Sequence, residues 1–397
     1  MLKYWLWLST RKGLGSRGAW LVAQHFLSPE AAYGAAPEEY AKIEGLRSWE
    51  PLLDKDLSLP ERILRQCYEN EISILTAQDA AYPDRLKVSD DPPVVLYYKG
   101  ILPHLDGPSI GVVGTRKASV YGLTQARRLG YGLARCGCTV ISGGAKGIDT
   151  EALKGALTGG SPVIAVLGCG VDVVYPRENK QLFRDIMQNG CLISEYPPGT
   201  APLPQHFPVR NRIISGLSLG ILVAEAPEKS GALITADRAL EQGRDVFVLP
   251  ANVGVESCGG NLKLLREGAI PVRDAWDILQ EYDAQYPQLR NQQPLGSRSG
   301  GEIVVQPEPK EEPKPKKDID KPKAKAYIDL KDIMETLSRD EQTLAVLLQS
   351  GPMHIDVIVD QAQMAAGRAL ASLTLLEVKG IVQRPSARMY ELKQKEN

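Results

Sequence analysis

Six short apolar runs, separated by stretches with helical periodicity, constrain the fold of this chain more than any other feature. They are SIGVVGT (109–115), CTVIS (138–142), PVIAVLG (162–168), CLISEY (191–196), LGILVAEA (219–226) and DVFVLP (245–250). Near-continuous apolar runs are typical of strands that are covered on both faces, and alternation with helices is typical of crossover connections. The sequence therefore predicts an α/β fold built on an extended, Rossmann-like doubly wound parallel sheet.

Composition divides the rest of the chain. Residues 1–80 are predicted to form a helical N-terminal domain, in which Gly13-Leu14-Gly15 and Glu44-Gly45-Leu46 break the helices. This spacing is compatible with helix-hairpin-helix or SAM-like units and equally with a small helical cap that has glycine turns. Residues 81–285 contain the sheet. Residues 286–326 are predicted to be a disordered linker rich in Pro, Lys and Glu, which leaves residues 327–397 as a separate small module.

Charge and cysteine content exclude several classes of protein. The 47 Lys and Arg residues nearly balance the 48 Asp and Glu residues, and residues 109–280, with 18 basic and 15 acidic side chains, are only slightly basic. A histone-like protein is therefore excluded. The six cysteines include no C-x-x-C, no apolar run approaches the roughly 18 residues of a membrane span, and no secretory signal is recognisable. A cytoplasmic protein without membrane contact is expected.

The loops that follow the strands are where a doubly wound sheet binds its ligands. The first, at Gly111–Ser119, is not G-x-G-x-x-G, and the second strand ends in Ser142-Gly143-Gly144 without an acidic residue for a ribose, so NAD is disfavoured. A Walker motif is absent, which disfavours an ATPase. Instead, the sequence predicts two adjacent phosphate-binding sites, one at Thr115 and Arg116 and one at Gly144 and Lys146. Each loop alone could also be a tight strand-to-helix turn.

Two later loops extend this prediction. Phe207 stands close to Arg210, Asn211 and Arg212, and an aromatic ring beside planar donors suits an unpaired base and its phosphates. Ser230-Gly231 again opens a predicted helix. Two alternatives remain open, namely that Phe207 fills the core and that one arginine of the pair is structural, salt-bridged to the sheet.

Catalytic constellations are not recognisable in the sequence. The four histidines, His25, His104, His206 and His354, are scattered over the predicted domains, so neither a triad nor a metal cluster can be assembled. Several acidic residues near the loops could act as general bases, but an acid just inside a helix start more often caps the helix. They are Asp149, Asp172, Glu195, Glu225 and Asp237. We expect no catalytic residue, no metal and no cofactor.

An ordered series of motifs resembles one known family. GVVGTRKAS, SGGAKGIDTEALKGAL, VIAVLGCGVDVVYPRENKQL, LISEYPPGT, FPVRNRIISGLS and VAEAPEKSGALITADRALEQGR resemble the DNA-processing protein A (DprA, or Smf) family. This resemblance implies a cytoplasmic protein that binds single-stranded DNA, protects it, and loads the recombinase RecA during natural transformation. It also implies a homodimer formed through the Rossmann-like domain, a helical N-terminal domain and a C-terminal winged helix.

The resemblance also assigns roles to residues. Thr115, Arg116, Phe207, Arg210, Asn211 and Arg212 occupy the positions that contact the strand in the family. Lys146 stands where the family usually has arginine, which keeps the charge but loses the planar fork, and Leu153 stands where it usually has histidine.

The last module is predicted to be the winged helix, with residues 365–379 as its recognition helix. That helix offers only Arg368 and Lys379, and residues 327–397 carry 8 basic against 10 acidic side chains. Because a helix that reads DNA is normally basic, a protein-contact role is favoured over duplex binding.

A rival prediction is an enzyme, since the two-loop arrangement also resembles nucleotide phosphoribohydrolases of the LOG group. Those enzymes carry P-G-G-x-G-T-x-x-E, whereas this chain has EKSGALITADRA, without the Gly-Gly pair and the glutamate. The sequence therefore favours a non-enzymatic binder.

Overall fold

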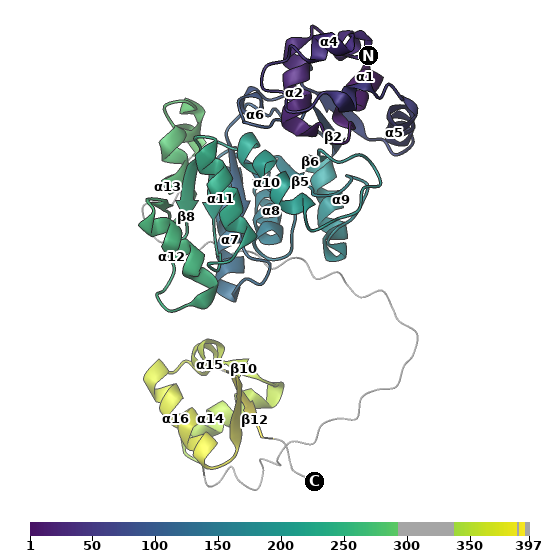
Figure 1. Cartoon of the computed structure of the whole chain (residues 1–397). Helices are drawn as coiled ribbons and strands as arrows, with labels where there is room; N and C mark the ends of the chain where they lie inside the picture. Colours follow the sequence, from purple (N-terminus) through teal and green to yellow (C-terminus); the bar gives the residue numbers. More distant parts are fainter. Residues whose placement is uncertain (293–336, 387–388, 394–397) are drawn as a thin grey trace, which may run out of the picture. The chain divides into compact units, whose positions relative to one another are not determined.

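The computed structural model describes residues 1–292, 337–386 and 389–393. The chain divides into two compact units, Met1–Val305 and Gln306–Asn397, which are described separately (Figure 1). Among the described residues, no helix has the length and apolar content that a membrane span requires.

A nine-stranded sheet forms the centre of the first unit, in the order β1-β2-β6-β5-β4-β3-β7-β8-β9. Its parallel part consists of the six predicted strands, and β9 (Ile270–Pro271) extends it beside β8. The predicted doubly wound α/β fold is confirmed. The order of the strands reverses between β3 and β7, which is where ligands bind in such sheets. The six strands are β3 (Ser109–Val113), β4 (Thr139–Ser142), β5 (Val163–Val166), β6 (Gly190–Ser194), β7 (Gly220–Val223) and β8 (Asp245–Val248).

Helices cover both faces of this sheet (Figure 1). On one face, apolar residues of α7 (Val120–Arg135), α8 (Ile148–Gly159), α9 (Lys180–Asn189) and α13 (Ala275–Leu279) are buried in one core cluster. On the other face, a second cluster contains residues of α6 (Asp84–Lys87), α10 (His206–Leu217), α11 (Gly231–Glu241) and α12 (Gly259–Arg266). Burial of both faces explains why the strands are nearly all apolar.

The helices α7 and α8 pack with their backbones almost in contact. A Cβ added at Gly130 would lie 2.2 Å from the carbonyl oxygen of Ala152, and one at Gly155 would lie 2.1 Å from that of Arg127. Only glycine fits at these positions, so this close packing fixes how α8 leaves the β4–α8 loop of the site.

The N-terminal helices share the core of the sheet. They are α1 (Leu2–Ser9), α2 (Gly15–His25), α3 (Pro29–Gly34), α4 (Pro37–Tyr40), the 3-10 turn η1 (Glu50–Leu53) and α5 (Ser58–Glu69). Trp5 and Trp7 lie in the same cluster as Val112 and Val163. β1 (Ser73–Thr76) pairs antiparallel with β2 (Val95–Gly100), which pairs antiparallel with β6. The predicted boundary at residue 80 is therefore misplaced, because it separates β1 from its sheet.

The predicted linker also begins too early. The 3-10 turns η4 (Gln280–Tyr282) and η5 (Pro287–Gln292) continue the first unit, and Leu289 is fully buried in its core. The Tyr286 hydroxyl donates to the carbonyl oxygen of Asp106. These contacts hold residues 286–292 against the sheet domain, whereas the rest of the predicted linker lies outside the described residues.

The second unit is a winged helix. It contains α14 (Arg339–Leu347), the 3-10 turn η8 (Leu348–Ser350), α15 (Ile355–Ala362) and α16 (Ala366–Val378). The unit also contains a small sheet in the order β10-β12-β11, with β10 (Met353–His354) before α15, and β11 (Val382–Ser386) and β12 (Met389–Leu392) after α16. The predicted helices and wing are confirmed, and β10 is an additional short strand that the sequence did not indicate.

Candidate nucleic-acid interface

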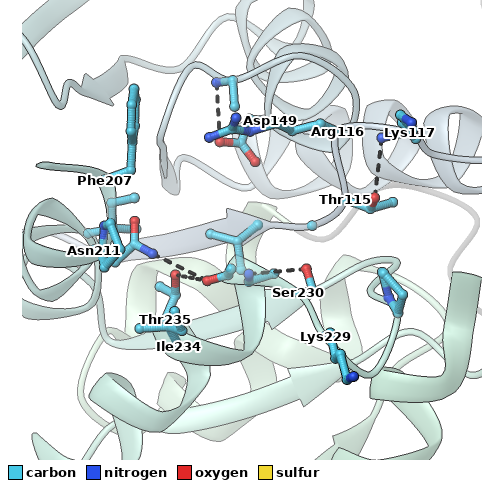
Figure 2. Close-up of a pocket in the computed structure, with 18 of the residues that line it drawn as sticks. Thr115, Arg116, Lys117, Asp149, Phe207, Asn211, Lys229, Ser230, Ile234 and Thr235 are labelled. Carbon is cyan, nitrogen blue, oxygen red and sulfur yellow. Dashed lines mark hydrogen bonds between the residues drawn. The ribbon is translucent and has the colours of Figure 1, made fainter. Parts of the chain in front are cut away.

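An open pocket of about 700 Å³ lies at the switch point between β3 and β7. The loop after β3 and the first turns of α10 and α11 line it (Figure 2). The pocket brings together seven of the ten predicted site residues. They are Thr115, Arg116, Phe207, Arg210, Asn211, Ser230 and Gly231.

A buried carboxylate holds the β3–α7 loop in shape. Glu225 is 1% exposed and accepts hydrogen bonds from the backbone N–H of Ser119 (3.0 Å) and from its hydroxyl (2.6 Å). The same hydroxyl accepts from Gly122 N and so caps α7. Glu225, which the sequence presented as a possible general base, is thus used to anchor the loop that carries Thr115 and Arg116.

Phe207 forms the aromatic surface of the pocket. The Cζ atom of Arg116 lies 5.3 Å from the centroid of the Phe207 ring, that of Arg210 lies 5.8 Å away, and the Tyr175 ring lies at 5.6 Å. Phe207 is half-buried and belongs to neither core cluster of the sheet. The alternative that it fills the core is therefore wrong. Tyr175 also lines the pocket, and its only local sequence signal is that of an aromatic residue in a loop after a strand.

Arg210 reaches the pocket from a buried position. It is 4% exposed, and its Nη1 donates to the carbonyl oxygens of Gly143 (2.8 Å) and Val166. Burial lowers the pKa of this guanidinium to about 10, and the nearby charge of Asp149 opposes that shift. Arg210 thus supports the end of β4 and the loop that follows it.

Asp149 lies beneath the same loop. Its Oδ2 accepts from the backbone N–H groups of Gly143 (3.1 Å) and Ala145 (3.3 Å). Burial raises its pKa to about 6, although Arg210 and the two amides favour the charged form. As at Glu225, the carboxylate organises a loop.

Arg212 does not line the pocket. It is 3% exposed, and its Nη2 donates to both oxygens of Glu195 (2.8 and 2.9 Å) and to the Ser16 hydroxyl (2.9 Å), while its Nε lies 2.9 Å from Asp91. The predicted strand contact at Arg212 is therefore replaced by a structural role, as the alternative of one salt-bridged arginine anticipated. The partners come from distant parts of the chain, so no local signal could have identified them.

Asn211 and Ser230 connect the two helix starts that line the pocket. The Asn211 side chain donates to the carbonyl oxygen of Gly231 (3.3 Å), and the Ser230 hydroxyl accepts from Ala232 N (3.2 Å) to cap α11. A Cβ at Gly231 would meet nothing within 4 Å, so the first turn of α11 is open to the pocket. Lys117 and Lys229, one residue from predicted positions, also line it.

The second predicted phosphate-binding site, at Gly144 and Lys146, lies beside the pocket. Gly144 has φ of +65° and accepts a hydrogen bond from Asn179, and exposed Lys146 is ion-paired with Glu178 at 2.5 Å. Neither Gly144 nor Lys146 lines the pocket, although Ala145 does. Leu153 is fully buried in the core, so this departure from the family pattern places an apolar side chain among apolar neighbours.

The fold and the pocket define an extended Rossmann-like protein with an aromatic, cation-lined site at its switch point. Family models match this chain in two places. The model for the DNA recombination-mediator protein A family matches residues 73–283, and the model for the DprA winged helix domain matches residues 332–386. The chain belongs to the DNA recombination-mediator protein A (DprA/Smf) family.

Individual relatives agree with this assignment. Protein Smf of Synechocystis is 35% identical over 395 residues, which cover 98% of both chains. DNA processing protein DprA of Streptococcus pneumoniae is 40% identical over 247 residues, or 62% of this chain and 86% of that protein. A crystal structure of the pneumococcal protein superposes with a TM-score of 0.63 at 36% identity, covering 71% of this chain and 98% of that one.

Proposed function

We propose that this protein binds single-stranded DNA in the pocket at the switch point, protects incoming strands and loads RecA onto them during natural transformation. It does so in the cytoplasm as a homodimer formed through the Rossmann-like domain. The ring of Phe207, placed in the pocket between two guanidinium groups, is the observation that carries this proposal. The transfer to RecA, the dimer and the setting in transformation rest on membership of the family.

A single strand suits the aromatic side of the pocket. Stacking on Phe207 needs a base whose face is free, and in a duplex that face is covered by the neighbouring pair. Tyr175, 38% exposed and in contact with the Phe207 ring, enlarges the apolar surface available to the base. The pocket is thus suited to an extruded or unpaired nucleotide.

Phosphate binding suits the opposite side. Arg116, Lys117 and Lys229 are exposed, and among the described residues none of them is in an ion pair. The first turn of α11 lines the same side through Gly231 and Ala232, although the Ala232 and Leu233 amides already donate to Ser230. Cations without protein partners can neutralise phosphates without first breaking an ion pair.

Binding, without chemistry on the strand, is the function that we propose. Asp149, which lines the pocket, and Glu225, which anchors the β3–α7 loop, are both engaged by backbone amides, while the exposed Glu256 lines the pocket from the turn before α12. A hydrolase of the LOG type needs a carboxylate placed to activate water, and the helix start at EKSGALITADRA lacks the glutamate that those enzymes carry there. We therefore favour the binder over this rival enzyme.

Fluorescence anisotropy tests the proposal. A labelled oligo-dT strand and a duplex of the same length are titrated with the full chain at matched salt. We expect clearly tighter binding of the single strand, because the near-neutral chain has little non-specific attraction for a duplex. Equal affinity for the two would contradict the proposal. Pull-down of RecA, with and without single-stranded DNA, tests the recombinase step separately.

A further inference from the structure

A second cavity, of about 680 Å³, is lined by the N-terminal helices together with α11. The two glycine turns that break the N-terminal helices both contribute to it, and the switch-point pocket uses none of its residues. We call it the glycine-turn cavity. It is lined by residues 13–18, Leu21, residues 45–48, Asp90, Asp91 and Arg238.

The two glycine turns have the same geometry. In each, the leucine N–H, at Leu14 and at Leu46, donates to the carbonyl oxygen three residues earlier at 3.3 Å. The glycine before the leucine has a positive φ, +89° at Gly13 and +76° at Gly45. A Cβ at Gly18 of α2 would lie 3.0 Å from Leu14 and 3.4 Å from Leu46, so both leucines pack against the same point of α2. Two matching turns thus form one wall of the cavity.

These turns present arginines that have no protein partner. Arg17 and Arg47 are exposed and line the cavity, and neither forms an ion pair with another described residue. Arg238 also lines it and pairs with Glu241 at 2.7 Å. The exposed Asp90 is the acid that opposes these charges. Positive charge therefore exceeds negative charge among the unpaired groups of the lining, which favours an anion.

A buried guanidinium lies directly behind the same wall. The Nη2 atom of Arg212 donates to the Ser16 hydroxyl (2.9 Å), and its Nε lies 2.9 Å from Asp91. Both of these partners line the cavity. The Nη1 atom of Arg212, which is 3% exposed as a residue, has no hydrogen-bond partner among the described residues. A buried donor without a partner is unfavourable, and a negative charge in the cavity would compensate it.

The lining favours the backbone of a duplex over an unpaired base. None of its residues, all within the described range, is aromatic, so the cavity has no surface on which a base could stack. A Cβ at Gly15 would meet nothing within 4 Å, which leaves room for a phosphodiester backbone beside the turn. Duplex DNA presents its phosphates without exposing a base face.

Helix α11 connects this cavity to the switch-point pocket. Gly231 and Ile234 line the pocket, and Arg238, one turn beyond Ile234 on the same side of the helix, lines the glycine-turn cavity. All three residues are exposed. A DNA molecule whose duplex lies on the cavity can therefore place the adjoining unpaired nucleotides in the pocket.

We propose that the glycine-turn cavity is a second nucleic-acid site, which binds backbone phosphates of duplex DNA next to the single strand held in the switch-point pocket. This inference rests on the proposed function. Arg17 and Arg47 supply the contacts to phosphate. Because two such contacts add little affinity for a duplex alone, the site acts on DNA whose single-stranded part occupies the pocket.

The test compares oligo-dT of about 16 nucleotides with the same strand joined to a duplex of about 20 base pairs. For the wild type, the slope of log K against log salt should be steeper for the tailed duplex by about 2, since each phosphate of a duplex contributes about 0.9. The full chain with Arg17→Gln and Arg47→Gln should lose this difference. Its binding of oligo-dT alone should be unchanged, because neither arginine lines the switch-point pocket.

A matched control removes two arginines elsewhere on the N-terminal helices. Arg62→Gln with Arg65→Gln changes exposed cations of α5 that line neither cavity, and this variant should bind both DNAs like the wild type. Should the double variant at Arg17 and Arg47 not fold, Arg47→Gln alone should lower the tailed-duplex slope by about 0.9.

Three outcomes would overturn the inference. The first is equal slopes of the wild type on the two DNAs. The second is wild-type binding of the tailed duplex by the double variant, which would favour an acidic protein segment as the ligand of Arg17 and Arg47. The third is an equal loss on both DNAs, which would place these arginines in the strand site. If the wild type does not bind oligo-dT at all, the proposed function itself fails.

Discussion

Phe207 is the side chain on which the affinity for an unpaired base should depend most. We expect Phe207→Ala to weaken binding of oligo-dT by about 1–3 kcal/mol, because the stacking surface is removed. The slope of log K against log salt should stay nearly constant, since no charge is removed. Anisotropy titrations at several salt concentrations measure both quantities.

Arg116→Ala is the matched contrast for this variant. It should lower the salt slope by about 0.7, the value for one neutralised phosphate on a single strand. A wild-type slope in a folded Arg116→Ala protein would mean that Arg116 only packs against Phe207. A large slope change in Phe207→Ala would mean that the ring acts by positioning Arg116.

Asp149 makes stability depend on pH in a direction that is unusual for a carboxylate. Its pKa is raised from 3.8 to about 6, chiefly by burial, so the folded state favours the neutral acid. The stability that this group contributes is present below about pH 4 and is lost as the pH rises through 6. Relative to Asp149→Asn, the wild type should therefore lose stability between pH 4 and 7.

Urea denaturation of the wild type and of Asp149→Asn across this pH range measures the difference between their free energies of unfolding. The contributions of other titrating groups largely cancel in this difference. Each unit of pKa shift corresponds to about 1.4 kcal/mol. A difference that does not change with pH would show that Asp149 titrates normally. A difference of the opposite sign would show that Arg210 and the backbone amides outweigh burial.

At the scale of elements, α10 organises the site because its side chains contact different parts of the structure. Phe207 and Arg210 line the pocket, and Asn211 donates a hydrogen bond to the start of α11. Arg212 lies outside the pocket lining and forms an ion pair with Glu195. Through Ser16, Arg212 also connects α10 to the first turn of α2. The N-terminal helices are therefore fastened to the element that carries Phe207.

We expect Arg212→Gln to destabilise the fold by about 2 kcal/mol, because it leaves Glu195 and Asp91 without their cation. Since Arg212 does not line the pocket, affinity for oligo-dT per folded molecule should change little. Denaturation and anisotropy on the same preparation separate the two effects. A loss of affinity with unchanged stability would restore Arg212 as a strand contact.

At the scale of the whole molecule, the two cations of the predicted recognition helix in the winged-helix unit both have acidic partners. Arg368 of α16 is paired with Asp340 at 2.8 Å, and Lys379, which follows α16, is paired with Glu341 at 2.7 Å. The two basic residues of the predicted recognition helix are therefore already neutralised. This favours the predicted role in contacting a protein.

A chain ending at Gln292 should consequently bind oligo-dT within a few-fold of the full chain, since a tenfold loss corresponds to about 1.4 kcal/mol. The cut is placed there because Leu289 is part of the core. Pull-down of RecA by both chains tests the partner interaction. Loss of DNA binding by a folded, dimeric truncated protein would show that the winged helix reads DNA.

Local sequence patterns determined the strands, the doubly wound sheet, the loops that line the pocket and the winged helix. They could do so because a strand buried on both faces, or a glycine loop before a helix, has a recognisable residue pattern within about ten residues. Arg116 was identifiable because it stands in such a loop, and Phe207 because it stands in the first turn of the helix that follows a loop.

Only the tertiary structure decided what the buried charged groups do. Arg212 interacts with Ser16, Asp91 and Glu195, and Glu225 accepts hydrogen bonds from Ser119. These partners are separated by 17 to 196 residues along the chain. An arginine that binds DNA and one that is satisfied by buried carboxylates look the same in sequence. Likewise, the apolar side chains of the N-terminal helices did not reveal that they would join the core of the sheet. Such roles depend on which partners the fold brings within hydrogen-bond distance, and no local pattern records that.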